Sequence, residues 1–240
     1  MIRLASIAII FILAFQQPLF ADSAAQELVK KADLRRGLQN SFSMKVKALV
    51  QDGADRSEAI YSVKVRDADT SLVEQISPAR AQGRKLLMKG LAMWLFTPQV
   101  KKPVRISLAQ KLTGDVANGD ISRTNYAHDY EAKLSGEDAA SQATILDLTA
   151  NDKRVTYAKI KYWISKQNFR PLKAEFYALS GKLMKTATFS DFKKIEGTER
   201  MSKVIIQDAV VPSKKSILLY SEQKSQSFPD SLFNKEQMDR

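Results

Sequence analysis

The sequence predicts a mainly β (α+β) protein, in which a wrapped antiparallel sheet of about eleven strands is covered at one opening by one or two helices. Two observations lead to this fold class. From Phe42 onward most apolar residues recur with a period of two, which is typical of half-buried strands. Turn signals such as Asp52-Gly53, Ser180-Gly181 and Glu196-Gly197 interrupt the pattern at short intervals. Consecutive antiparallel strands of this kind curl into a barrel or a wrapped sheet.

The first residues have the pattern of an export signal. Arg3 precedes an apolar run from Leu4 to Phe15, and the small residue Ala21 follows it. A basic start, an apolar stretch and a small residue are typical of a secretory signal peptide. We therefore expect a signal peptide at residues 1–21, cleavage after Ala21, and one domain in residues 22–240. An uncleaved anchor is the alternative, although the apolar run is shorter than the roughly 20 residues that a spanning helix needs.

The first mature segment, residues 24–38, is expected to be a helix because its apolar residues recur at helical spacing opposite lysines and arginines. Between residues 99 and 130 the period of two is lost. A short helix is expected there within Ser107 to Val116, and Gly114 and Gly119 indicate loops beside it. The tail is expected to hold one short helical turn at residues 231–237. The expected strands are 42–50, 59–66, 70–76, 82–89, 91–97, 143–148, 156–165, 172–178, 183–192, 201–208 and 214–223.

Composition restricts the chemistry that the protein can perform. The 240 residues include 38 Lys and Arg against 26 Asp and Glu, which gives a formal net charge of +12 spread along the chain. Such a charge favours lipid head groups, nucleic acid or acidic proteins as partners, and a merely solvated basic surface explains it equally well. Export argues against nucleic acid. The sequence has no Cys, which excludes disulfides, thiolate nucleophiles and Cys-ligated metals.

Several expected strands are apolar on both faces. In the strand 91–97, Leu91, Met93 and Leu95 alternate with Ala92, Trp94 and Phe96. Each face of such a strand needs something to pack against. One face can pack under the covering helices, while the other either lines a hydrophobic pocket or contributes to a thick core. The pattern alone leaves both interpretations open.

Several groups of residues resemble a known family. Gly90, Trp94-Leu95-Phe96 and Pro98, followed by Lys101-Lys102 and Arg105-Ile106-Ser107, resemble the pattern of the outer-membrane lipoprotein-sorting protein family. Gly119-Asp120-Ile121-Ser122 and Asp129-Tyr130 resemble a second motif of that family, with its middle Ser lost or displaced. The segment 168–172, Asn-Phe-Arg-Pro-Leu, resembles the start of one of its strands. Gly181-Lys182-Leu183 and Phe189-Ser190-Asp191-Phe192 resemble the strand pair that follows it, so the resemblance covers nearly the whole mature chain.

This resemblance implies an unclosed antiparallel β-barrel of the LolA/LolB type, with helices as a lid over a hydrophobic cavity. It implies a periplasmic carrier that binds acyl chains of a lipoprotein or lipid and passes them towards the outer membrane. It also implies an inner-membrane exporter of the resistance-nodulation-division type as a partner, with transient contact to the membrane surface and no cofactor. The alternative is a regulatory or scaffold protein that binds a membrane protein without a lipid cargo. Regulators of this fold usually carry a second domain, for which this sequence has little room.

The expected lipid-binding residues are the large apolar side chains on one face of the predicted strands. Which face each occupies follows from the period of two, and a shift of one residue reverses it. The expected lining is Met44, Val46, Tyr61, Val63, Leu86, Met88, Trp94, Phe96, Ile160 and Tyr162. The basic residues that follow the strand 91–97 are expected to contact a lipid head group or a partner: Lys101, Lys102 and Arg105.

No catalytic or metal site is expected. The one histidine, His128, precedes Asp129, and neighbours along a strand point to opposite faces, so the pair is poorly placed for general base catalysis. The sequence contains no Gly-x-Ser-x-Gly elbow, no P-loop, no dinucleotide fingerprint and no EF-hand loop. We therefore expect a binding protein rather than an enzyme.

Overall fold

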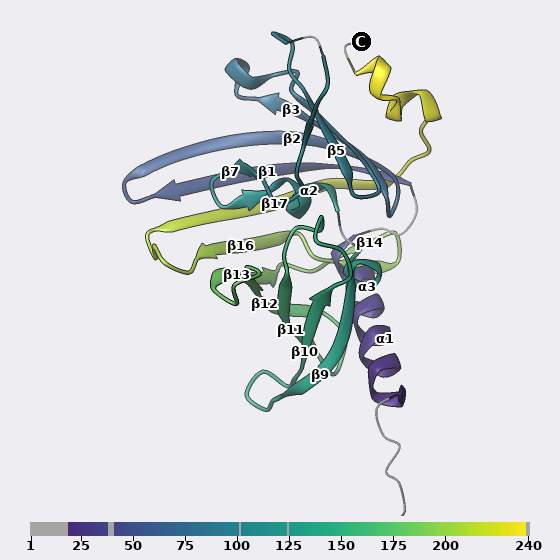
Figure 1. Cartoon of the computed structure of the whole chain (residues 1–240), viewed down its shortest axis with the longest axis vertical. Helices are drawn as coiled ribbons and strands as arrows, with labels where there is room; N and C mark the ends of the chain where they lie inside the picture. The colour runs from purple at the N-terminus through teal and green to yellow at the C-terminus, as the bar shows by residue number, and fades with distance from the viewer. Residues whose placement is uncertain (1–18, 38–40, 101, 124, 239–240) are drawn as a thin grey trace, which may run out of the picture.

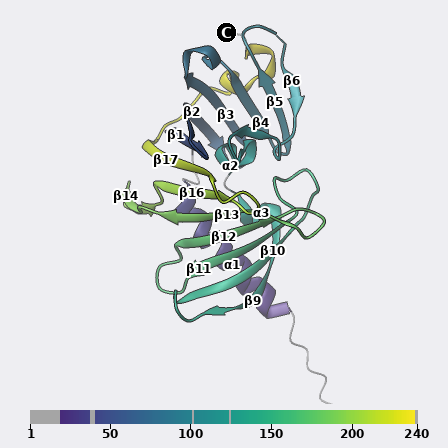
Figure 2. The same ribbon diagram turned by 90° about the vertical axis from the view of Figure 1, so that its left-hand side faces the viewer.

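Thirteen antiparallel strands form one open sheet in the computed structural model, which describes residues 19–37, 41–100, 102–123 and 125–238. The strand order is β6-β5-β4-β3-β2-β1-β17-β16-β13-β12-β11-β10-β9. Within the described residues, the edge strands β6 and β9 do not pair with each other. Figure 2 shows the succession from β5 and β6 at one end of the molecule to β9 at the other. The predicted mainly β, unclosed antiparallel fold is confirmed.

The sheet strands are β1 (Phe42–Asp52), β2 (Asp55–Asp67), β3 (Thr70–Ser77), β4 (Lys85–Lys89), β5 (Ala92–Phe96), β6 (Val104–Ile106), β9 (Tyr130–Asp138), β10 (Ala143–Ala150), β11 (Lys159–Ser165), β12 (Pro171–Tyr177), β13 (Leu183–Ser190), β16 (Lys203–Asp208) and β17 (Lys214–Ser225). Two small hairpins accompany them, β7 (Lys111–Thr113) with β8 (Val116–Ala117), and β14 (Lys193–Ile195) with β15 (Thr198–Arg200). The expected strands all overlap observed ones, whereas β6, β9 and the two hairpins were not expected.

The expected short helix between Ser107 and Val116 is wrong. That segment turns back on itself as the β7–β8 hairpin, in which Gly114 adopts a φ of +51° that few other residues tolerate. A short helix, α2 (Asn118–Ser122), follows it instead, and α3 (Tyr126–Asp129) comes next.

Strand β1 shows why the pattern of apolar residues sets the register of the sheet. Phe42, Met44, Val46 and Ala48 are all buried, while the residues between them are partly or fully exposed. β1 pairs along its whole length with β2 and also with β17. A slip of one residue would expose all four apolar side chains, so burial specifies this pairing strongly.

Irregular pairings bend the sheet around its buried face. The register shifts between Ser43 and Lys45, between Ile145 and Leu146, and in three other strand pairs of the main sheet. A β-bulge increases the local twist of a strand and bends it. The bulges therefore allow thirteen strands to curl around one core rather than extend as a flat layer.

Helix α1 (Leu19–Arg36) covers the buried face of one half of the sheet. Ala25, Val29 and Ala32 are at most 2% exposed, and the helix contacts β9, β11 and β12. Figure 2 shows α1 crossing behind these strands. The helix overlaps the expected 24–38 and begins at Leu19, ahead of the expected cleavage after Ala21. The rest of the expected signal peptide, residues 1–18, lies outside the described residues, in which no helix is long and apolar enough to cross a membrane.

The C-terminal segment covers the opposite face of the other half. Two 3₁₀ helices, η2 (Asp230–Phe233) and η3 (Lys235–Gln237), lie where one helical turn was expected. They are the yellow coils beside β3 and β5 in Figure 1. Phe233, which is fully buried, and Met238 pack there on Leu72, Leu87 and Phe96.

Candidate functional site: the concave face and its helical cover

The concave face of the sheet is the candidate binding site, and eight of the ten expected lipid-binding residues lie on it. Seven belong to the main core cluster: Met44, Val46, Tyr61, Val63, Leu86, Ile160 and Tyr162. Met88 lies on the same face in a smaller cluster with Met93 and Leu108. All eight are buried, and four of them have no exposed surface at all: Val46, Val63, Ile160 and Tyr162.

Trp94 and Phe96 lie on the opposite face, which corrects the expected common lining. In the β4–β5 pair, Leu86 lies opposite Leu95, whereas Leu87 lies opposite Trp94. Leu86 and Leu95 pack in the main core, while Trp94 and Phe96 pack in the outer cluster under the C-terminal segment. The strand is apolar on both sides because the outer side also has a cover. Because both faces of this strand are apolar, the alternation of its side chains does not show which face lies on the concave side of the sheet.

Two small hollows remain between the concave face and its cover. One, of about 240 Å³, is lined by apolar Phe42, Met44 and Val65 and by polar Asp33 and Asn125, among others. The second, of about 110 Å³, lies between β7 and the sheet. Its lining includes Tyr61, Leu86, Leu95, Ile106 and Leu112. Both are smaller than the roughly 300–1,000 Å³ of ordinary ligand pockets. In this conformation the concave face is therefore largely filled by its own side chains and cover.

Larger hollows lie outside this space. One of about 480 Å³ is lined by Leu49, Val50 and Ile217 together with charged residues of β2 and β17. Another, of about 380 Å³, lies beside Tyr157, Leu183 and Met184. Neither is lined by any of the ten expected lipid-binding residues.

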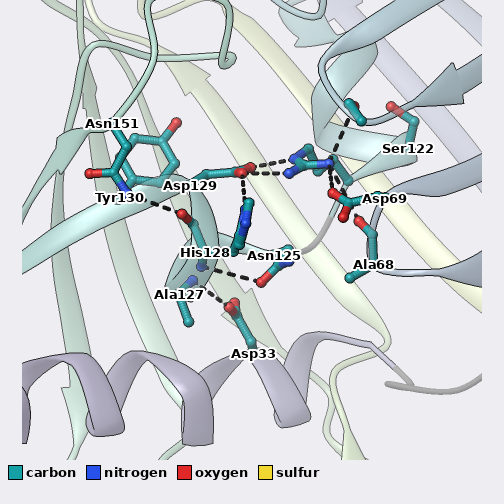
Figure 3. A network of polar contacts seen from close by, with 12 residues as sticks. Asp33, Ala68, Asp69, Ser122, Asn125, Ala127, His128, Asp129, Tyr130 and Asn151 are labelled. Carbon is teal, nitrogen blue, oxygen red and sulfur yellow. Dashed lines mark hydrogen bonds and ion pairs between the residues drawn. The ribbon is translucent and has the colours of Figure 1, made fainter.

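Arg123 attaches the cover to the sheet at three points. Its guanidinium makes a bidentate ion pair with Asp129 of α3, and both side chains are about 5% exposed. The same guanidinium donates to Asp69 Oδ1 at 2.9 Å and to the Gly90 carbonyl at 3.3 Å. Figure 3 shows Asp129 and Asp69 on either side of this contact. One side chain thus joins α3 to the β2–β3 and β4–β5 turns, because the planar guanidinium offers five donors at fixed angles.

A second polar contact joins α1 to α3. Asp33 Oδ2 accepts a hydrogen bond from the Ala127 amide at 2.8 Å (Figure 3). Asp33 Oδ1 accepts one from Arg36 at 3.2 Å. The Arg36 guanidinium also lies 3.6 Å from the centre of the Tyr126 ring. Burial raises the pKa of Asp33 to about 7, and the neighbouring Arg36 only partly opposes this shift. The carboxyl group of Asp33 therefore changes from protonated to ionised near neutral pH.

Asp120 attaches α2 to the other half of the sheet. Its carboxylate accepts hydrogen bonds from Lys185 Nζ on β13 at 2.8 Å, from the Tyr157 hydroxyl at 2.5 Å and from the Ala117 amide at 2.8 Å. Burial, aided by the Asp120 charge, raises the pKa of Tyr157 well above its usual value, so the hydroxyl stays protonated and donates. The second motif noted in the sequence is thus an attachment point of the cover.

Gly119 lets α2 approach the sheet closely. A Cβ atom at this position would lie 2.0 Å from Thr156 Oγ1, which no real contact permits. The residue therefore has a steric role, and no larger side chain fits without displacing Thr156.

The sequence analysis missed most of these attachment residues. Asp33 and Arg36 are charged residues within a helix that packs by its apolar positions. Lys185 lies on the buried face of β13, together with the apolar side chains at 187 and 189. A charge at a position that the period of two assigns to the interior was the available signal. Such a position indicates that Lys185 is buried with a partner of opposite charge. It does not indicate that the partner is Asp120, which lies 65 residues away in the chain.

His128 has no catalytic surroundings. Its Nδ1 lies 3.3 Å from Asp129 Oδ1, so the expectation that the two side chains point apart is wrong. The two residues lie in a helical turn, not on a strand. Asp129 is nevertheless engaged by Arg123, and the His128 side chain is 69% exposed. The described residues contain no group of three His, Asp or Glu side chains that could hold a metal ion.

The expected head-group residues lie at the β6 edge. Lys102 and Arg105 are exposed, and Arg105 lies opposite Trp94 in the β5–β6 pair. Lys101 lies outside the described residues. Arg105, like Trp94, therefore lies on the side of the sheet opposite the concave face.

Comparison with known proteins identifies the family. A family model described as an uncharacterized protein matches residues 67–240. A LolA superfamily protein from Nitrosomonas europaea is 38% identical, with a TM-score of 0.84, over 88% of this chain and 97% of that chain. No curated protein matches.

Two further structures share the fold. An outer membrane lipoprotein-sorting protein domain from Vibrio parahaemolyticus is 21% identical, with a TM-score of 0.79, over 91% of this chain and 100% of that chain. A DUF1329 family protein from Desulfovibrio piger is 22% identical, with a TM-score of 0.76, over 89% and 97%. With the identity to the Nitrosomonas protein and the open, helix-covered sheet, the conclusion is plain: this chain belongs to the LolA superfamily.

Proposed function

We propose that this protein is a periplasmic carrier, with residues 22–240 as one mature domain, that binds acyl chains of a lipoprotein or lipid on the concave face of its sheet. The observation that carries the proposal is a contrast within the site. The concave face is apolar from β4 to β16, yet α2 and α3 of its cover make several buried polar contacts beside the packing of Ile121 and Tyr126.

Polar attachment suits a cover that moves aside. A hydrogen bond within the protein contributes only about 0.5–1.5 kcal/mol net, because water replaces it when it breaks. Each CH₂ group of an acyl chain that leaves water contributes about 0.8 kcal/mol. A cargo chain of several CH₂ groups can therefore offset the separation of several such contacts, and the two hollows mark where the chain would begin to enter.

Release requires an acceptor that covers the cargo better than the carrier does. The Vibrio structure is named as an outer membrane lipoprotein-sorting protein domain, which supports a lipoprotein cargo and delivery towards the outer membrane. An inner-membrane exporter as the donor stays a prediction. No bond is made or broken in this exchange, so the proposal assigns no catalytic residue.

Uptake of a fluorescent fatty acid tests the proposal with a matched pair of variants. Leu95 lines the 110 Å³ hollow on the concave face, while Leu49 lines the 480 Å³ hollow on the outer face. We expect Leu95→Trp to weaken uptake at least about tenfold, since its indole occupies the entry space at a cost of the order of 1.4 kcal/mol. Leu49→Trp should leave uptake unchanged.

Mass spectrometry of an organic extract of the purified protein identifies the natural cargo. Equal uptake by both variants, or greater loss with Leu49→Trp, contradicts the concave site. Co-purification of a membrane protein with no lipid in the extract would instead favour a regulatory or scaffold role.

A further inference from the structure

The positive charge of the chain is concentrated in one segment, although the composition suggested an even spread. Residues 75–114 contain eight Lys and Arg and no Asp or Glu, so they carry a formal charge of +8 out of the net +12. The eight are Arg80, Arg84, Lys85, Lys89, Lys101, Lys102, Arg105 and Lys111.

This acid-free segment forms one end of the sheet. It comprises β4, β5 and the edge strand β6, with the loops that precede β4 and β6. The two loops lie side by side, as Gly83 and Pro98 show: a Cβ atom on Gly83 would lie only 3.2 Å from the Pro98 side chain. Figure 2 shows β6 as the outermost strand at this end. We call the exposed side chains of Arg80, Arg84, Val100, Lys102, Val104 and Arg105 the β6 edge surface. It includes both sides of the edge strand, because Val104 lies opposite Leu95 and Arg105 lies opposite Trp94.

The four basic side chains of the β6 edge surface have no acidic partner. Within the described part of the chain, Arg80, Arg84, Lys102 and Arg105 form neither an ion pair nor a side-chain hydrogen bond. Elsewhere bases are commonly paired, as in Arg170–Glu199 at 2.5 Å and Lys159–Asp147 at 3.1 Å. The unneutralised charge therefore comes from the absence of acids in this stretch, and it favours an anionic partner.

Two exposed valines stand among these bases. Val100 is 56% exposed and Val104 is 51% exposed, on either side of Lys102 and Pro103. A short edge strand that contains an arginine and follows a proline is poorly suited to pairing with a strand of another protein. Apolar side chains flanked by Lys and Arg are instead suited to the boundary of a lipid bilayer, where the apolar groups enter and the bases stay at the phosphates.

We propose that the β6 edge surface docks the protein on an anionic lipid bilayer. Val100 and Val104 enter the head-group region, and Lys102, Arg105, Arg80 and Arg84 contact lipid phosphates. The inference rests on the proposed carrier function, in which docking brings the protein to the membrane that supplies or receives the acyl chain.

Co-sedimentation with vesicles tests this docking on the full mature chain. The vesicles contain phosphatidylcholine alone or phosphatidylcholine with phosphatidylglycerol. We expect binding only to the second kind, weakened by added salt. Lys102→Gln with Arg105→Gln should weaken binding roughly 30-fold, since each base near an anionic surface contributes about fivefold. Val100→Ser with Val104→Ser should weaken binding to the anionic vesicles at low salt and at high salt alike, because the apolar contribution is not screened.

The matched control removes the same charge elsewhere. Lys193 and Lys194 are exposed on β14 and form no ion pair within the described residues. Lys193→Gln with Lys194→Gln should leave vesicle binding within about threefold of the wild type. Equal loss in both pairs means that overall charge alone attracts the vesicle, and it overturns the assignment to the β6 edge surface. Binding that persists in the Lys102/Arg105 pair overturns it as well.

Fatty-acid uptake in vesicle-free solution separates this inference from the proposed function. Normal uptake together with lost vesicle binding in the Lys102/Arg105 pair supports both proposals. Vesicle binding without any fatty-acid uptake contradicts the carrier function alone. A wild-type protein that ignores anionic vesicles but binds polyglutamate overturns the bilayer in favour of an acidic protein partner.

Discussion

The two halves of the sheet are covered in different ways. On the half from β9 to β13, helix α1 packs on the concave face and is tied down by polar contacts. Gln26 accepts from the Ala132 amide at 3.0 Å, and the Arg35 carbonyl accepts from the Met201 amide at 2.8 Å. On the half from β3 to β5, the C-terminal segment packs on the outer face through apolar side chains such as Phe233. The concave cover thus adds several polar attachments to its apolar packing, whereas the outer cover is attached mainly by apolar side chains.

The difference indicates which cover is suited to open. Separating polar attachments exposes groups that water can satisfy, whereas lifting the C-terminal segment would expose aromatic and aliphatic surface at about 25 cal/mol per Å². Helix α2 lies between the halves in Figure 1 and is attached to both. Variants that act on one cover only can sharpen or break this comparison.

Asp120→Ala is expected to have the largest effect. It leaves the Lys185 ammonium, whose side chain is 7% exposed, without its carboxylate. Removing one partner of a buried pair costs about 3–5 kcal/mol. Urea unfolding should show this loss. Asp120→Ala combined with Lys185→Met should recover much of it, because no uncompensated charge remains. A single variant as stable as the wild type would contradict the attachment of α2 through this pair.

Phe233→Ala tests the outer cover. Phe233 is fully buried against Leu72, Leu87 and Phe96, so truncation should lower the free energy of unfolding by about 3 kcal/mol. Fatty-acid uptake by the folded variant should remain normal, since this cluster lies on the face opposite the proposed site. Reduced uptake at full stability would show that the two faces are not independent.

Gly119→Ala should cost less, about 1–3 kcal/mol, through the collision of its Cβ with Thr156. Adding Thr156→Ala removes the hydroxyl that the new methyl meets and should restore part of the stability. Thermal unfolding of the single and double variants measures the difference. A double variant less stable than the sum of the two single changes would show that this contact is not the cause.

The smallest effect, taken over a single pH unit, is expected in the pH dependence of the α1 attachment. The native Asp33 carboxyl keeps its proton up to about pH 7, whereas an unfolded Asp releases it near pH 4. Between these values the native state binds more protons than the unfolded state, so stability falls as the pH rises. Relative to Asp33→Asn, the wild type should lose at most about 1.4 kcal/mol per pH unit across this window. Parallel stability curves for the two proteins would contradict the raised pKa.

Much of the architecture follows from local pattern. Phe42, Met44, Val46 and Ala48 alternate with polar residues, and the period of two sets both the strand and the buried face of β1. Gly53, at a φ of +61°, closes the expected turn. These features need only the residue and its neighbours along the chain.

The tertiary structure alone decided the rest. Trp94 and Leu95 are both apolar, and only the packing of the C-terminal segment on one side shows that Trp94 faces away from the site. Asp120 and Lys185 are each ordinary charged residues in the sequence, and their pairing depends on how a curled sheet brings α2 to β13. The sequence by itself determined eleven of the strands, because side-chain alternation is a local property. Which face is enclosed, and how its cover is attached, depended on contacts between residues far apart in the chain, which no local period encodes.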